Sequence, residues 1–337
     1  MINRESMVVE VMDVTGHKTS KFPISKAVMT GGTNARVVIS VLNLDKYIAA
    51  SSTNTNLSEV LDKDLVALRE SGRIPVLTTN ANSDDQTKLA TIDFDAAIIE
   101  ESGMSGFSTQ AFQDLYKAKG ASFLEFSYDN YEASIQAIAT IGILVGEEEA
   151  AQKYIDYCES VIKAVKEKEG SKYGTVTVMG VVMTNAVCGL GGDYHEAMEV
   201  AGGKDLADFK TSTKKFPDGS DNTWLLDPKY NPQYLVHYSS VTFGSDPKTS
   251  TMSAIQKNFS ETAAYKVGNY YVMNGVLPLP VRIAYTAEIL YPDCFENGWK
   301  ESVLKEYMTE FVGAADFDPS SAKVLWSTAD IQALLSS

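Results

Sequence analysis

The chain has 337 residues, of which 44% are hydrophobic and 22% charged, so it is long enough to fill the cores of two soluble domains. Its formal net charge of −15 argues against nucleic-acid binding, because phosphate recognition needs clustered lysine and arginine. No apolar run reaches the roughly 18 residues that a membrane-spanning helix needs. The three cysteines are too widely spaced for a metal-binding motif.

The N-terminal half alternates short apolar strands with helical segments. Such alternation predicts a parallel sheet with crossover helices, and therefore an α/β fold. We expect strands at residues 26–30, 74–78, 96–100 and 122–126. We expect helices at residues 35–44, 58–70, 109–119 and 131–144.

A single long helix is expected over residues 147–169. Apolar residues recur there with the 3.6-residue period, acidic residues open the segment, and lysines lie near its end, as the helix dipole favours. The sequence therefore predicts an N-terminal α/β lobe at 1–145, a connecting helix at 146–170 and a C-terminal α/β lobe at 171–337. A ligand cleft is expected between the lobes.

The C-terminal half resumes the same alternation. We expect strands at residues 175–182, 234–238 and 270–273. We expect helices at residues 194–200, 253–265, 281–290, 300–311 and within 320–337.

Loops that follow strands are the first places to seek a ligand site, because open α/β sheets bind ligands beyond the carboxyl ends of their strands. The turn TGGTN at 30–34 could offer backbone donors to an anion at a helix start, with Arg36 adding a charge. The alternative is a plain turn that needs glycine. In the other half, Arg282 follows the loop 274–280 and could present a planar donor fork to an oxyanion. We expect it to lie outside the core.

A second glycine-rich loop, 185–195, leads into a helix for which Asp193 is the expected N-cap. His195 is either a ligand contact or a packed residue. Glu100 and Glu101 could do acid–base work, although a solvated strand end is the simpler interpretation. No nucleophile–base pair, nucleotide-binding glycine motif or histidine-rich metal site is visible. We therefore expect binding without catalysis, no intrinsic cofactor and no protein-bound metal.

Seven fragments, in order along the chain, resemble the substrate-binding proteins of ABC importers for iron–siderophore, haem and cobalamin. They are VEVMDVTGHKTSKFPISKAVM, TGGTNARVVISVLNLDKYIAASS, TIDFDAAIIEES, IATIGILVGEEEAAQKY, AMEVAGGKDLAD, NPQYLV and AAYKVGNYYVMNG. The resemblance implies two Rossmann-like lobes joined by one helix, modest hinge motion, and docking of both lobes onto an ABC permease.

The function implied by this resemblance is delivery of an iron complex, such as a ferric-siderophore-like chelate, by a monomeric extracytoplasmic protein. The protein would be periplasmic or lipid-anchored, with a native signal sequence that is absent before Met1. The alternatives are a binder of haem, cobalamin or an oxyanion such as molybdate. A cytoplasmic sensor or a metal-cluster enzyme on the same fold is a further alternative.

The resemblance also implies positions for the ligand and the permease. Ligand contacts are expected at Gly31, Gly32, Thr33, Asn34, Met104, Tyr128, Cys188, Tyr194, His195 and Arg282. The glutamates with which such proteins often meet permease arginines would fall at Thr87 and Leu225 here. The nearby acidic residues expected to replace them are Asp84, Asp85, Asp221 and Asp227.

Overall fold

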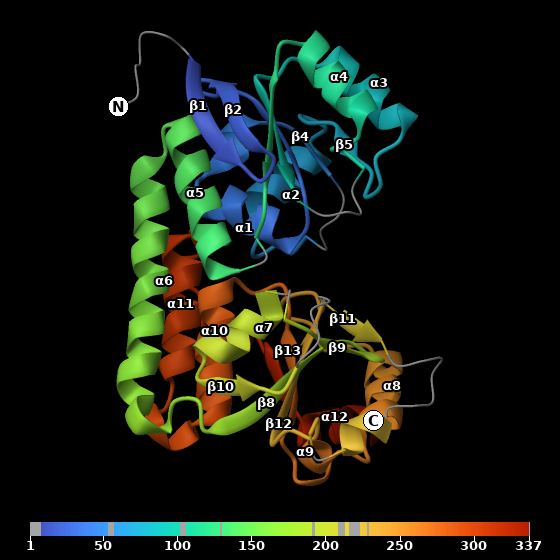
Figure 1. The fold of residues 1–337 in the computed structure, drawn as a ribbon, viewed down its shortest axis with the longest axis vertical. Helices are drawn as coiled ribbons and strands as arrows, with labels where there is room; N and C mark the ends of the chain where they lie inside the picture. The colour runs from blue at the N-terminus through green and yellow to red at the C-terminus, as the bar shows by residue number, and fades with distance from the viewer. Residues whose placement is uncertain are drawn as a thin grey trace. The chain divides into compact units, whose positions relative to one another are not determined.

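The structure is a computed structural model that describes residues 8–52, 57–101, 106–128, 130–190, 193–207, 213–215, 223–227 and 229–336. It divides into two compact units, Met1–Asp156 and Tyr157–Ser337. The boundary falls inside helix α6, Glu148–Glu169. Figure 1 labels helices and strands in both units where there is room.

Unit 1 is built on a five-stranded sheet whose strands are all parallel. The strands in spatial order are β5 (Val76–Leu77), β4 (Ile48–Ser52), β3 (Ala27–Thr30), β6 (Ala96–Glu100) and β7 (Ser122–Phe126). In chain order this is 3-2-1-4-5, the order of a Rossmann-like half. The central strand β3 is buried along its whole length, as expected for a strand covered on both faces.

Helices cover both faces of this sheet (Figure 1). They are α1 (Thr33–Val41), α2 (Lys63–Glu70), α3 (Ser83–Thr91), α4 (Gln110–Ala118) and α5 (Tyr131–Val145). Phe112 and Tyr116 of α4 join Phe94 and Phe107 in an aromatic cluster over the sheet. A two-stranded hairpin, β1 (Val8–Asp13) and β2 (Gly16–Lys21), adjoins the outer strand β7.

Helix α6 is continuous over 22 residues, so the predicted long helix is confirmed. Glu148 and Glu149 open it and Lys166 and Lys168 lie in its last turn, which suits the helix dipole at both ends. Its buried stripe includes Ala151, Tyr154, Cys158, Val161 and Val165.

Unit 2 contains a seven-stranded mixed sheet. Its parallel strands are β8 (Val176–Met183), β10 (Gly203–Asp205), β12 (Tyr234–Ser239) and β13 (Tyr270–Asn274). Three short antiparallel strands complete it: β9 (Ala186–Cys188), β11 (Thr213–Lys215) and β14 (Leu325–Ser327). The helices are α7 (Asp193–Val200), α8 (Thr249–Phe259), α9 (Ala263–Lys266), α10 (Leu279–Leu290), α11 (Trp299–Glu310) and α12 (Thr328–Ser336).

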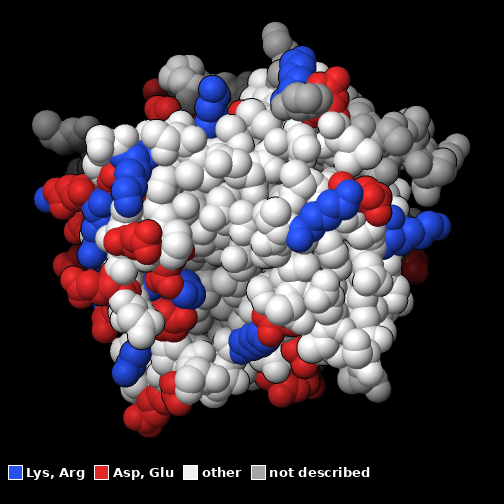
Figure 2. Space-filling model, turned by 90° about the horizontal axis from the view of Figure 1, so that it is seen from below, with Lys and Arg blue, Asp and Glu red and all other residues white. Residues whose placement is uncertain are grey.

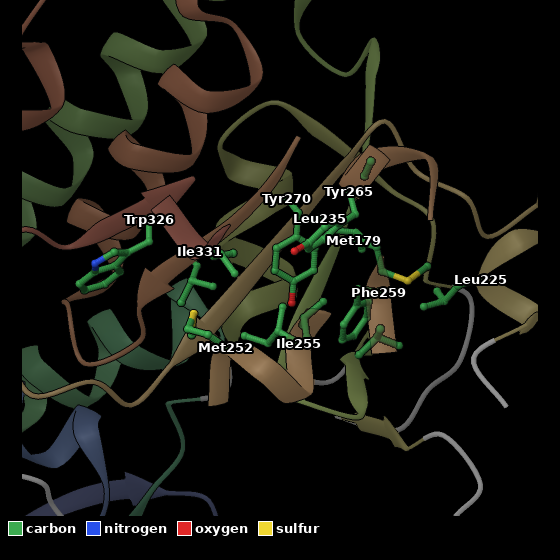
Figure 3. Packing of buried hydrophobic residues seen from close by; sticks show 14 of the residues in the cluster. Met179, Leu225, Leu235, Met252, Ile255, Phe259, Tyr265, Tyr270, Trp326 and Ile331 are labelled. Atoms are coloured by element: carbon green, nitrogen blue, oxygen red, sulfur yellow. The ribbon is translucent and has the colours of Figure 1, made fainter. Parts of the chain in front are cut away.

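The core of unit 2 combines aliphatic and aromatic side chains (Figure 3). Tyr270 is fully buried, packs within 5.5 Å of the rings of Phe259 and Tyr265, and shares a hydrogen bond of 3.0 Å with His237. Met252 and Ile255 of α8 belong to the same cluster. Burial lowers the pKa of His237 to about 3, so this histidine is a neutral core residue.

The α/β prediction is confirmed, while several element boundaries are corrected. The predicted helix at 253–265 is two helices, α8 and α9, because Thr262 caps a new helix by accepting a hydrogen bond from the Tyr265 N–H. Asp193 is the first residue of α7 instead of its cap. Within the described part of the chain, none of the helices is both long and apolar enough to cross a bilayer.

Candidate functional site

The point where strand order reverses in unit 1 lies between β3 and β6, and this is where Rossmann-like sheets bind ligands. Glu100 ends β6 and sends its carboxylate across the end of β3 to the start of α1. Its Oε2 accepts a hydrogen bond of 2.5 Å from the Gly32 N–H. Gly32 is the N-cap of α1, so the amino end of this helix already holds an internal anion.

Gly31 is required by this arrangement. Its φ of +154° lies in the region that favours glycine, and a Cβ added there would collide with the Glu100 side chain and with Ala35. The Gly31 N–H donates to Ser52 Oγ at 3.3 Å. The glycine-rich turn is therefore shaped around Glu100 and the end of β4.

These contacts correct the expectation that the turn offers its donors to an anionic ligand. The N–H of Gly32 is taken by Glu100. Arg36 is also engaged: it is 4% exposed, and its Nη1 lies 3.0 Å from Asp62 Oδ2. Burial raises the pKa of the Asp62 carboxyl, while Arg36 opposes that rise.

Three of the remaining unit 1 candidates, Thr33, Asn34 and Tyr128, lie in segments that follow strands of this sheet. Thr33 and Asn34 are half-buried in the first turn of α1. Tyr128 follows β7 and is buried, and its pKa is raised by burial and further by the charge of Glu100. Met104 lies outside the described residues.

The corresponding reversal in unit 2 lies between β8 and β12. Tyr238, near the end of β12, stacks on Tyr194 of α7 with ring centroids 4.4 Å apart and planes 6° from parallel. The Arg282 guanidinium carbon lies 4.8 Å from the Tyr194 centroid and 6.0 Å from that of Tyr238. A cation over aromatic faces at these distances is favourable, so the three side chains form one unit, called here the Tyr–Arg stack.

The Tyr–Arg stack is braced by its neighbours. The Tyr194 hydroxyl donates to the Gly275 carbonyl at 3.4 Å, and a Cβ on Gly275 would approach that hydroxyl to 3.0 Å. Tyr238 shares a hydrogen bond of 3.3 Å with Thr286. Arg282 is 1% exposed, which corrects the expectation that it lies outside the core, whereas Tyr194 is half-buried.

His195 follows Tyr194 on α7 but turns to a different partner. Its Nδ1 lies 2.6 Å from Asp205 Oδ2, and its Nε2 lies 3.4 Å from Glu199 Oε2. The hydrogen bond to Asp205 raises the pKa of His195, and the nearby carboxylates add to the rise. His195 therefore has a structural partner in β10, and the structure does not join it to the Tyr–Arg stack.

Cys188 lies in strand β9 instead of a loop mouth, which corrects its predicted location. It is 1% exposed, and a Cβ on Gly180 of β8 would clash with its sulfur. Its place in the core follows from this close packing of β9 on β8.

Two buried polar side chains at strand ends were not among the predicted site residues. Thr30 ends β3 and Asn274 ends β13. Thr30 Oγ1 and Asn274 Nδ2 find no hydrogen-bond partner among the described residues, although both side chains are nine-tenths buried or more. Buried polar atoms without a hydrogen-bond partner are rare and costly in folded proteins. Thr30 and Asn274 therefore mark the carboxyl edges of the two sheets as unusual. The sequence signal that could have identified these two residues is a polar residue at the end of a buried strand.

The four acidic residues predicted to dock a permease differ in environment. Asp84 and Asp227 are exposed, and Asp221 lies outside the described residues. Asp85 is fully buried and closes a capping box with Asn82 at the start of α3, and it also accepts a hydrogen bond from the Thr78 N–H at 3.1 Å. The prediction that Asp85 contacts a permease was wrong, because a buried capping carboxylate cannot meet the surface of a partner protein.

The surface charges are mixed. On the face drawn in Figure 2, lysine and arginine atoms are interspersed with acidic atoms, and the middle of the face carries few charges. No basic stripe of the kind that tracks phosphates gathers on this face. Across the described residues, no three histidine, cysteine or acidic side chains are grouped to hold a metal ion.

Solved structures with the same architecture were found by comparison. CeuE of Helicobacter pylori with bound Ni(II) is 16% identical, covers 97% of this chain and 99% of its own, and has a TM-score of 0.69. The TroA-like periplasmic binding protein FepB of Veillonella parvula is 16% identical over 94% and 99%, with a TM-score of 0.67. The molybdate-binding protein MolA of Haemophilus influenzae is 13% identical over 90% and 98%, with a TM-score of 0.67.

No protein-family model matches the chain, and no curated protein matches it. The likeness to the solved structures nevertheless extends over nearly the whole length of each. The predicted architecture is confirmed: this chain has the fold of the class III, TroA-like periplasmic binding proteins.

Proposed function

We propose that this protein is the extracytoplasmic solute-binding protein of an ABC importer and that it delivers an iron complex to a membrane permease. The fold supports the solute-binding role, because the similar structures are periplasmic binding proteins by name. Their ligands differ, with Ni(II) in one and molybdate in another. The ligand of this chain must therefore be argued from its own site.

The observation that carries the proposal is the Tyr–Arg stack at the strand-order reversal of unit 2. Arg282 supplies a permanent cation with a planar donor fork, which suits carboxylate or catecholate oxygens. Tyr194 is the half-buried member, so a ligand meets its ring first. Because Arg282 is 1% exposed, this proposal requires the Tyr194 ring to move when a ligand oxygen binds the guanidinium.

The Gly31 turn is assigned no anionic group of the ligand in this proposal. Because Glu100 already fills the amino end of α1, the anionic groups of the ligand are assigned to Arg282 and not to this turn. A ferric chelate that carries carboxylate or catecholate oxygens fits the guanidinium of Arg282. Haem, cobalamin and molybdate are the alternative ligands.

The role is binding without turnover. We assign none of the polar groups at either edge as nucleophile or general base. A ferric chelate incubated with excess protein and then extracted should return with unchanged mass. A converted product would contradict this assignment.

A calorimetric and thermal-shift series provides the test of function. The probes are a ferric tris-catecholate, a ferric tris-hydroxamate, ferric citrate, haem, cobalamin and molybdate. A true ligand at 100 times its Kd should stabilise the fold by about 2.7 kcal/mol. Saturable binding of a ferric chelate supports the proposal, and binding of only haem, cobalamin or molybdate replaces it with that alternative. Silence from all six would overturn it.

Substitution of Arg282 locates the site. A charge-assisted hydrogen bond contributes about 1.5–3 kcal/mol, so Arg282→Ala should weaken binding of the anionic chelate by roughly tenfold to a hundredfold. Arg282→Lys keeps the positive charge without the planar donor fork, so its affinity should lie between those of the unmodified protein and Arg282→Ala. The matched control is Arg73→Ala, because Arg73 is exposed in unit 1. Equal affinity in the Arg282 and Arg73 variants would contradict the site.

A further inference from the structure

A carboxylate is buried at the carboxyl end of α6. Glu169 is the last residue of that helix and is 3% exposed. Neither of its carboxylate oxygens has a hydrogen-bond partner among the described residues. A buried ionised carboxylate without a partner is very costly, so the group must be neutral or the site must open.

The carboxyl group rests on the turn that follows α7. Gly202 has a φ of +78°, and a Cβ added there would collide with Glu169 Oε2. The ring of Tyr291 lies on the same glycine. Because Gly202 has no side chain, it leaves the space that the Glu169 carboxyl group occupies. The last turn of α6 thereby packs against the Gly202 turn.

The polar groups around this contact have other partners. The Tyr173 hydroxyl donates to the Glu199 carbonyl at 2.8 Å, and the Tyr291 hydroxyl donates to the Gly202 carbonyl at 2.6 Å. The Glu199 carboxylate faces His195 at 3.4 Å. Of the neighbouring cations, Lys168 lies 4.0 Å from Glu296 and Lys172 is exposed. A helix carboxyl end also repels negative charge, so nothing described here favours an ionised Glu169.

We propose that Glu169 is a proton-binding site that latches α6 to the Gly202 turn: the protonated acid fits this apolar contact, and loss of the proton unseats the last turn of the helix. This latch is independent of any solute and of the ligand site proposed above. It makes the end of α6 sensitive to the pH of the surrounding medium.

The sign of the effect follows from the protonation states. Burial raises the pKa of Glu169 from 4.5 to about 8. Between these values the folded protein holds a proton that the unfolded chain has released. The stability that this proton confers is fully present below the unfolded value, falls as pH rises through the interval, and is lost above the folded value.

Denaturation at a series of pH values tests the latch. The urea unfolding constant of the unmodified protein should rise, relative to that of Glu169→Gln, by up to about tenfold per pH unit between pH 5 and 8 and then level off. The neutral amide keeps the shape and removes the ionisation. The control is Glu167→Gln, because Glu167 lies on the same helix with its side chain 66% exposed. Parallel pH profiles for the unmodified protein and Glu169→Gln would overturn the proposal.

Two measurements on the unmodified protein keep the test decisive if the Gln variant fails to fold. Carbon-13 NMR of the Glu169 carboxyl should titrate with a midpoint near pH 8, and a midpoint below 6 would refute the latch. Hydrogen exchange should report the separation of the last turn of α6 from the Gly202 turn. The Gly174 N–H, which donates to the Gly202 carbonyl at 2.8 Å, should lose protection above the midpoint beyond the intrinsic rise with pH. Unchanged protection would remove the conformational part of the proposal.

Discussion

Glu100 Oε2 lies 2.5 Å from the Gly32 nitrogen, so the neighbouring strand supplies an anion to the amino end of α1. This internal contact occupies the position where an external oxyanion would bind, because both would use the same backbone donor. The amino end of α1 in unit 1 is therefore already paired with a carboxylate of this chain.

Removing this charge should weaken the fold of unit 1. Glu100→Gln loses a charge-assisted hydrogen bond and the favourable pairing with the helix dipole, so we expect the free energy of unfolding to fall by about 1–2 kcal/mol at pH 7. Urea denaturation measures the change. Glu101→Gln is the matched control, because Glu101 is exposed, and it should stay within about 0.5 kcal/mol of the unmodified protein. Equal losses in the two variants would show that the Gly32 contact has no special role.

Asp84 and Asp85 are neighbours with opposite roles. Asp85→Ala should cost about 1–3 kcal/mol of unfolding free energy, because the Thr78 and Asn82 N–H groups lose their buried acceptor. Asp84→Ala should change stability by less than about 0.5 kcal/mol, since its side chain is exposed. Chemical denaturation of both variants distinguishes them. If Asp85→Ala proved neutral, the capping box would not be the reason for its burial.

A break in α6 should be severe. Val161 is 3% exposed in the middle of the helix, so Val161→Pro removes a backbone hydrogen bond as well as buried contact and should cost ~3 kcal/mol or more. Lys163→Ala serves as the control, because its side chain is 75% exposed. Circular dichroism and urea melts report helix content and stability. Wild-type stability in Val161→Pro would argue against a continuous helix in solution.

Periodic patterns with a strong burial signal were predicted well from the sequence. The strands 96–100 and 122–126 match β6 and β7, and the long helix is one residue shorter than predicted. Short elements stabilised by tertiary pairing were not predicted. Strand β10 spans only Gly203–Asp205 and is defined by its register with β8, and α3 is set by the Asn82–Asp85 capping box.

The site was harder to predict because sequence position does not reveal which partner a polar side chain finds. Tyr194 and His195 are adjacent in the chain, yet one joins Arg282 and the other joins Asp205. Tyr238 reads as an ordinary strand residue until its ring is seen against Tyr194. Glu100 was judged a solvated strand end, since nothing in the sequence places its carboxylate on a glycine 68 positions earlier.

The burial of the arginines has a practical consequence for chemistry on this molecule. Arg36 and Arg282 are buried, Arg69 is half-buried, and Arg73 is the exposed member of the four described. Guanidine-directed dicarbonyl reagents should therefore modify Arg73 in the folded protein while the buried guanidinium groups of Arg36 and Arg282 are protected.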